Sequence, residues 1–200
     1  MSNIAIVFID AQNMYRGARR AFFVPTDAHM LGQFHPRALG ERVASHGRPG
    51  DARQLVEVRT YSGRPDPTRS PKTYAAHMRQ CAAWEASGVT VITRPLRYPA
   101  AWPAEKEREK GIDVLIAVDF VTMARDDRYE IGILASADTD LAPALEYVAK
   151  HKSMSKRVEV VAWRSQSARG RLSVSGLNVW CHWLDRTAHD AVADLTDYGL

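Results

Sequence analysis

Uniformly apolar segments that alternate with helical segments constrain the fold of this chain more than any other feature. The first apolar run, residues 4–9 (IAIVFI), is rich in β-branched side chains and stops at Asp10. Runs of this kind are typical of strands buried on both faces of a parallel sheet. Further strands are expected at 54–61, 89–93, 131–135, 157–163 and 177–183.

Helical spacing of apolar side chains separates these strands. We expect helices at 11–22, 37–45, 73–86, 112–124 and 141–150. The segment 112–124 is apolar almost all round, apart from Asp113, Asp119 and Thr122, which predicts a buried helix. Strands that alternate with helices predict an α/β protein, a three-layer α/β/α sandwich with a mainly parallel, Rossmann-like central sheet.

One domain over residues 1–200 is expected, because this length suits one domain and no repeat or linker interrupts the chain. The Pro- and Gly-containing segment 23–53 is expected to be an insertion, and 177–195 to hold a last strand and a terminal helix. No apolar run reaches the ~20 residues that span a membrane, and the start lacks the features of a signal peptide. Cys81 and Cys181 are expected to be reduced core thiols, which favours a cytoplasmic location.

Aspartates follow the predicted strands at the edge where ligands collect in parallel sheets. Asp10 ends the first strand, Asp138 and Asp140 follow the strand 131–135, and Asp113 lies in the first turn of its helix. Clustered carboxylates repel one another unless a cation compensates them, and hard oxygen ligands suit Mg²⁺ or Mn²⁺. The sequence therefore predicts a divalent-metal site in which Asp10 and Asp138 bind directly, and Asp113 and Asp140 directly or through water.

Helix capping is the alternative for single acids, because Asp10 and Asp140 each precede a predicted helix. Asp138 and Asp140 together exceed the need of one cap. Asp113 and Asp119 lie in an almost wholly apolar helix, where an unpaired carboxylate costs several kcal/mol. About 100° per residue separates these two side chains by about 120° around the helix, so they need not share a site. For Asp119 a structural pairing with an Arg or a backbone amide is left open.

Three short motifs follow one another along the chain: 10–13 (DAQN), 110–113 (KGID) and 136–140 (SADTD). They resemble the D-x-x-N, K-G-x-D and S-x-D-x-D motifs of a known family, the NYN domain, a branch of the PIN-like metal-dependent nucleases. Order and separation agree, and Asp119 matches a further acid of the central helix. The resemblance covers roughly residues 1–165.

The resemblance implies a PIN-like α/β/α fold and a site that uses Mg²⁺ or Mn²⁺. Its metal ligands and catalytic residues would be Asp10, Asp113, Asp138 and Asp140. Asn13 would support Asp10 by a hydrogen bond, and Ser136 would do the same near Asp138. RNA is the implied substrate.

A polyanionic substrate requires cations around the acids. Lys and Arg exceed Asp and Glu by 27 to 23, a net charge of +4 that is compatible with nucleic acid. The primary candidates for RNA binding are Arg16, Arg19, Arg20, Arg94 and Arg97. Further basic clusters are Lys150, Lys152, Lys156 and Arg157, and Arg164, Arg169 and Arg171.

The function expected from these features is metal-dependent endoribonuclease activity, the hydrolysis of RNA phosphodiester bonds at an aspartate cluster. One alternative is a Mg²⁺-dependent phosphohydrolase of a small phosphate ester with Asp10 as nucleophile, although Gln12 breaks the D-x-D pattern usual for that chemistry. The other is a non-catalytic RNA-binding or scaffold protein, in which loss of the acids would be expected. The sequence leaves open which RNA, single-stranded or structured, is cut, whether DNA is cut, the number of metals and the oligomeric state, a homo-oligomer included.

Overall fold

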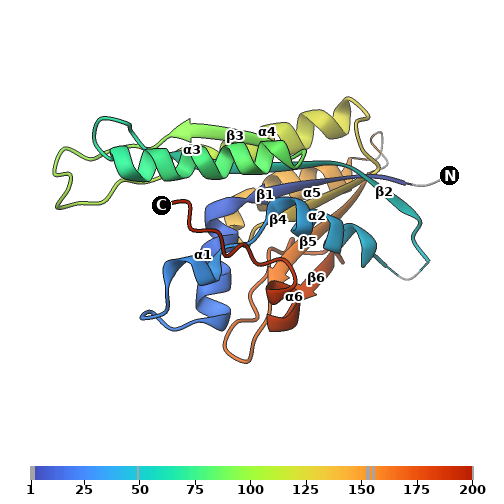
Figure 1. The fold of residues 1–200 in the computed structure, drawn as a ribbon. Helices are drawn as coiled ribbons and strands as arrows, with labels where there is room; N and C mark the ends of the chain where they lie inside the picture. Colours follow the sequence, from blue (N-terminus) through green and yellow to red (C-terminus); the bar gives the residue numbers. More distant parts are fainter. Residues whose placement is uncertain (1–2, 49, 152–153, 155, 200) are drawn as a thin grey trace.

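A six-stranded sheet forms the centre of the molecule (Figure 1). The computed structural model describes residues 3–48, 50–151, 154 and 156–199, and within them all neighbouring strands of this sheet are parallel. The strand order is β3-β2-β1-β4-β5-β6, which confirms the predicted α/β architecture. The strands are β1 (Asn3–Asp10), β2 (Arg53–Arg64), β3 (Thr90–Pro95), β4 (Ile131–Ala135), β5 (Arg157–Trp163) and β6 (Trp180–Leu184).

Helices cover both faces of the sheet and complete the three layers. One face carries α1 (Ala11–Phe22), α2 (Pro36–Ser45), α3 (Pro71–Ala86) and the short α6 (Arg186–Asp190). The other carries α4 (Ile112–Arg125) and α5 (Ala142–Lys150). Two short 3-10 helices are η1 (His29–Gly32) and η2 (Thr139–Leu141).

Alternation of side chains along β1 builds the two halves of the core. Val7 and Ile9 point to the α1 and α2 side, and Ile6 and Phe8 point to the α4 and α5 side. All four are at most 1% exposed, as expected for a central strand covered on both faces.

The direction in which the chain moves through the sheet reverses between β1 and β4. From β1 the chain passes outward to β2 and β3, and from β4 it passes the opposite way to β5 and β6. The loops that leave β1 and β4 therefore diverge and leave a crevice at the carboxyl ends of these two strands. Ligands of open α/β sheets bind at such a switch point.

Helix α4 differs from the wholly buried helix that its composition predicts. Ile116 and Phe120 are fully buried against the sheet, but Val114 and Val118, on the outer side, are 57% and 51% exposed. The expectation of burial all round was wrong because α4 lies in an outer layer, where only one face meets the sheet.

The segment between α1 and β2 contributes to the core. Leu39 and Val43 of α2 are fully buried against the sheet. Ahead of α2, the Arg19 guanidinium of α1 holds the loop in place by donating to the carbonyls of Val24, Asp27 and Ala28 at 3.2, 3.0 and 2.7 Å.

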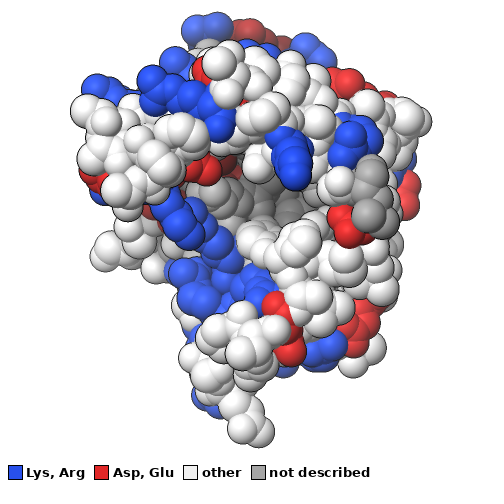
Figure 2. All heavy atoms as spheres, turned by 60° about the vertical axis from the view of Figure 1, so that its left-hand side comes forward, with Lys and Arg blue, Asp and Glu red and all other residues white. Residues whose placement is uncertain are grey.

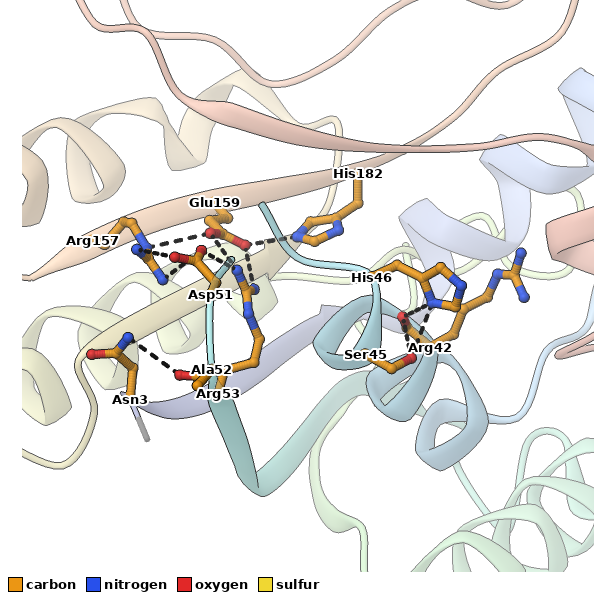
Figure 3. A network of polar contacts seen from close by, with 10 residues as sticks. All are labelled: Asn3, Arg42, Ser45, His46, Asp51, Ala52, Arg53, Arg157, Glu159 and His182. Carbon is orange, nitrogen blue, oxygen red and sulfur yellow. Dashed lines mark hydrogen bonds and ion pairs between the residues drawn. The ribbon is translucent and has the colours of Figure 1, made fainter. Parts of the chain in front are cut away.

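A network of buried charges joins the start of β2 to β5 and β6 (Figure 3). We call Asp51, Arg53, Arg157, Glu159 and His182 the Glu159 network. Arg53 Nη1 lies 2.8 Å and His182 Nε2 2.7 Å from Oε2 of Glu159, which is fully buried. Asp51 bridges Arg53 and Arg157 at 2.8 and 2.9 Å. Two acids and two guanidiniums thus compensate one another within the fold.

Both cysteines carry free thiols: Cys81 is buried and Cys181 is half-buried. Burial raises the pKa of each thiol to about 11, which makes both poor nucleophiles. Among the described residues, no helix combines the length and the apolar character that crossing a bilayer requires.

Candidate active site

Asp10 occupies the switch point because it is both the last residue of β1 and the N-cap of α1. Its Oδ1 accepts a hydrogen bond from the backbone N–H of Asn13 at 2.9 Å, and its Oδ2 accepts from Ser136 Oγ at 3.4 Å. The side chain of Asp10 therefore caps α1, as the helix-capping alternative predicts, and it also faces the loop after β4. Only 6% of Asp10 is exposed.

Asn13 and Ser136 connect this helix start to the loop after β4. Asn13 supports Asp10 through its backbone N–H, while its side-chain Oδ1 accepts from Ala137 N at 2.9 Å. Ser136 Oγ, which donates to Asp10, accepts from Asp138 N at 3.1 Å. The two predicted supporting residues thus join the two sides of the crevice.

The pKa of Asp10 is raised from 3.8 to about 6. Burial is the main cause, and the charges of Asp138 and Asp113 act in the same direction, against the hydrogen bonds from Asn13 and Ser136. Asp113 lies in the first turn of α4, on the other face of the sheet. Two of the other predicted acids therefore lie close enough to Asp10 to act on its charge.

Glu109 is a fourth acid at this edge, and the sequence analysis missed it. Its carboxylate accepts from the backbone N–H of Gly63. Burial raises its pKa, the charges of Asp10 and Asp113 act in the same direction, and Arg16 opposes them. Its position directly before the K-G-I-D segment was the available signal, although it lies in a run of charges that resembles a solvated loop. We call Asp10, Glu109, Asp113 and Asp138 the acidic edge.

Asp140 and Asp119 have other surroundings. Asp140 is exposed in η2, where its N–H donates to Asp138 Oδ1 at 3.0 Å. Asp138 caps η2, and the N-cap of α5 is Leu141, so the alternative in which Asp140 caps the helix after it was wrong. Asp119 Oδ2 accepts from Arg59 Nη2 at 2.8 Å and from the Tyr61 hydroxyl at 2.7 Å. This is the structural pairing that the sequence left open for Asp119.

The donors of the acidic edge fit a hard divalent cation, because all are carboxylate oxygens. Within the described part of the chain, no three His, Cys, Asp or Glu side chains are grouped tightly enough to form a ready metal cage. Mg²⁺ does not require a cage, since it is usually held by one or two carboxylates together with waters and substrate phosphates. Asp10 and Asp138 are the acids best placed for this, because they flank the crevice.

Lys and Arg side chains surround a hollow on the side where the strands end, and acidic atoms appear at its rim (Figure 2). Among the primary candidates, Arg16, Arg20, Arg94 and Arg97 are exposed. Arg19 is half-buried, and its guanidinium is engaged by the three carbonyls of the loop after α1. Exposed guanidiniums near the acidic edge suit a phosphate chain that approaches a bound cation.

Two hollows adjoin residues of the acidic edge or its supporting residues. One, of about 340 Å³, is lined by Arg97, Arg108, Lys110 and the Glu109 of the acidic edge, among others. The second, of about 370 Å³, contains Asn13 and Ala137 in its lining and extends away between α1 and the loop after β5. Both hollows therefore carry basic side chains near the acids.

The basic cluster around residue 150 lies elsewhere. Lys150 pairs with Glu146, Lys156 with Asp127 and Arg157 with Asp51, and Arg157 begins β5 at the opposite end of the strand from the acidic edge. Lys152 lies outside the described residues. Local ion pairs thus explain the described members of this cluster.

Comparison with known proteins agrees with this architecture. A crystal structure of a protein of unknown function from Vibrio parahaemolyticus is similar at 18% sequence identity and a TM-score of 0.53, over 88% of this chain and 94% of that one. This likeness concerns the fold alone. A search of curated proteins found no significant match. The model of the NYN domain matches residues 4–175, a range that contains the acidic edge and its supporting residues. The chain therefore belongs to the NYN domain family, a family of PIN-like nucleases.

Proposed function

We propose that the chain is a Mg²⁺- or Mn²⁺-dependent endoribonuclease that hydrolyses RNA phosphodiester bonds at the acidic edge. The observation that carries this proposal is the convergence of Asp10 and Asp138 on Ser136 at the switch point, where the Ser136 hydroxyl donates to Asp10 and accepts from the backbone N–H of Asp138. Burial, together with the charges of Asp138 and Asp113, raises the pKa of Asp10 to about 6, and a bound divalent cation would offset the cost of keeping this carboxylate ionised at neutral pH. Family membership supports nuclease chemistry, and RNA is the substrate that it favours.

The residues of the site have separate roles in this proposal. Asp10 and Asp138 would hold the cation, with Asp113 and Asp140 bound directly or through water. Ser136 and Asn13 keep the two sides of the crevice in register through their hydrogen bonds. When bound, the cation would lower the pKa of a water molecule and neutralise charge on the phosphate.

Cleavage of labelled RNA in Mg²⁺ or Mn²⁺ tests the proposal. Asp10→Asn and Asp138→Asn should each lower kcat/KM by about 100-fold or more, because each removes a charged oxygen ligand. Asp126→Asn is the matched control, since Asp126 is exposed at the C-terminal end of α4 and pairs only with the neighbouring Arg125 among the described residues. Activity that survives in both site variants would overturn the assignment.

The same preparation separates the alternatives. A phosphohydrolase of small esters would cleave p-nitrophenyl phosphate better than RNA. A scaffold would bind RNA with equal affinity as wild type and as Asp10→Asn, and neither would cleave it. The two hollows beside the acids favour a polymer over a small ester, because a small ester would occupy only one of them.

A further inference from the structure

The second hollow is bounded by three segments of the chain. Its walls are α1, the start of the loop after β4, and the loop that follows β5. Its volume of about 370 Å³ falls in the range of small-molecule sites. Asn13 and Ala137, whose hydrogen bond joins the two sides of the crevice beside Asp10, form the end of the hollow nearest the acidic edge.

The floor of the hollow is fixed by close packing. Trp163 is nearly buried, and its indole N–H donates to the carbonyl of Met14 at 2.9 Å. Gly17 permits this approach, because a Cβ at this position would lie 3.0 Å from Trp163 Cδ1. The opposite rim is held by two bonds, from Ser165 N to the carbonyl of Ala168 at 2.9 Å and from Ala168 N to Ser165 Oγ at 3.1 Å. The hollow is thus a built feature with defined walls.

Two cations that have no partner in the described part of the chain lie at the hollow. Arg20 of α1 and Arg169 of the loop after β5 line it and are exposed, and no hydrogen bond or ion pair of either guanidinium occurs among the described residues. By contrast, Arg19, the neighbour of Arg20, is engaged by three carbonyls. The described lining contains no acid. A ligand with anionic oxygens is the chemistry that this arrangement fits.

We propose that this hollow binds the nucleotide next to the scissile phosphate of a single-stranded RNA, with Arg20 and Arg169 on its phosphate oxygens. The inference rests on the proposed function, because the acidic edge at the end of the hollow defines where the scissile phosphate lies. A single strand suits the hollow because an unpaired nucleotide can leave its stack and enter a hollow of this size. Paired bases in a duplex remain outside it.

Binding is tested with a fluorescent single-stranded RNA by anisotropy, in the Asp10→Asn background so that the RNA stays intact. Arg20→Ala combined with Arg169→Ala should weaken binding on the order of tenfold or more. The slope of log Kd against log salt concentration should also decrease, by the amount that corresponds to the loss of about two phosphate contacts. Arg125→Ala, which removes a charge at the opposite edge of the sheet, should bind within about twofold of the parent. Unchanged binding in the double variant would overturn the proposal.

Gly170 offers a matched pair that adds bulk with and without charge. It lines the hollow, and a Cβ there would meet no atom within 4 Å. Gly170→Glu should weaken binding several-fold more than the isosteric Gly170→Gln, because a carboxylate repels phosphate. Equal effects of the two substitutions would show that charge at the hollow is irrelevant, against the proposal.

A duplex of the same sequence tests the requirement for an unpaired nucleotide. The double variant should lose affinity for the single strand and change little for the duplex; equal losses would indicate a general basic surface and overturn the inference.

In the active protein the double variant should raise KM more than it lowers kcat. If no form cleaves RNA but the double variant still loses binding, the proposed chemistry fails and the hollow stands. If Asp10→Asn abolishes cleavage while the double variant binds and cleaves normally, the hollow alone fails.

Discussion

Asp10 and Glu159 are both buried acids of the central sheet, yet their surroundings shift the pKa values of the two carboxyls in opposite directions. Burial by itself raises the pKa of either carboxyl. At Glu159, hydrogen bonds from His182 and Arg53 outweigh burial and lower the pKa to about 2. At Asp10 the nearby charges of Asp138 and Asp113 add to burial, and the pKa rises to about 6.

The difference indicates that Glu159 has a structural role, whereas the charge of Asp10 is available to a ligand. The Glu159 network is complete within the chain, with a cation opposite each acid. Asp10 of the acidic edge accepts hydrogen bonds from Asn13 and Ser136, but no guanidinium of the described residues bonds to it. It therefore retains an unfavourable interaction in the folded protein, a common property of functional sites.

The largest expected effect is on the Glu159 network. Glu159→Gln should lower the free energy of unfolding by about 3–5 kcal/mol, because Arg53 loses its buried counter-charge. Urea unfolding at pH 7 measures this. Glu146→Gln is the matched control: Glu146 forms an exposed pair with Lys150 and should cost under about 1 kcal/mol. Equal losses would contradict the structural role of the network.

Lowering the pH should change the contributions of Glu159 and Asp10 to the stability of the protein in opposite directions. Glu159 has a lowered pKa in the folded state, so its contribution, on the order of 3 kcal/mol, is present above pH 4.5 and is lost as the pH falls toward 2. Asp10 has a raised pKa, so metal-free protein loses stability as the pH rises from about 4 through 6. Denaturant titrations from pH 2 to 7 of wild type, Glu159→Gln and Asp10→Asn should show two slopes of opposite sign, each absent in one variant.

Asp10→Asn should stabilise the metal-free protein at pH 7 by about 1–3 kcal/mol while it abolishes cleavage, because it removes a charge that the fold does not compensate. The gain should disappear near pH 4, where the wild-type carboxyl is protonated. Asp126→Asn, at an exposed position, should change stability by less than about 0.5 kcal/mol at either pH. A loss of stability in Asp10→Asn at pH 7 would count against the repulsion inferred here.

The smallest of these effects is the stabilisation by Mg²⁺ or Mn²⁺. At about ten times its Kd, a cation bound only by the folded state adds about 1.4 kcal/mol. Thermal unfolding should show this gain in wild type and not in Asp10→Asn, while Glu159→Gln, although less stable, should gain as much as wild type. Stabilisation of Asp10→Asn to the same degree would place the cation elsewhere.

Most of the fold could be predicted because apolar runs report burial directly. The run before Asp10 predicted β1, and the runs at 131–135 and 157–163 coincide with β4 and β5. The exposed side of α4 could not be predicted, because Val114 has the same apolar character whether it faces the sheet or solvent. The composition of a segment indicates how apolar a helix is, whereas the assembled sheet determines which of its faces is covered.

Some acids of the candidate site could likewise be placed from the sequence, and others could not. Asp10 and Asp138 could be placed at one edge, since each directly follows a strand of a parallel sheet. Glu109 could not, because it is fixed by the backbone of Gly63, 46 positions earlier in the chain. Glu159 likewise gave no signal within its apolar strand, since its partner Arg53 is 106 positions away. Contacts between distant segments depend on the assembled sheet.

The pairing of β1 with β4 has a consequence for how the protein matures. β1 is synthesised well before β4, and Asp10 reaches Ser136 across 126 positions of chain. Until β4 has emerged, the nascent chain contains β1, β2 and β3 with Asp10 at an unfinished edge and none of the acids of the loop after β4. The effect of Asp138 on Asp10 therefore arises only after β4 and the loop that follows it have joined the sheet, and truncation before β4 would leave a chain without the crevice.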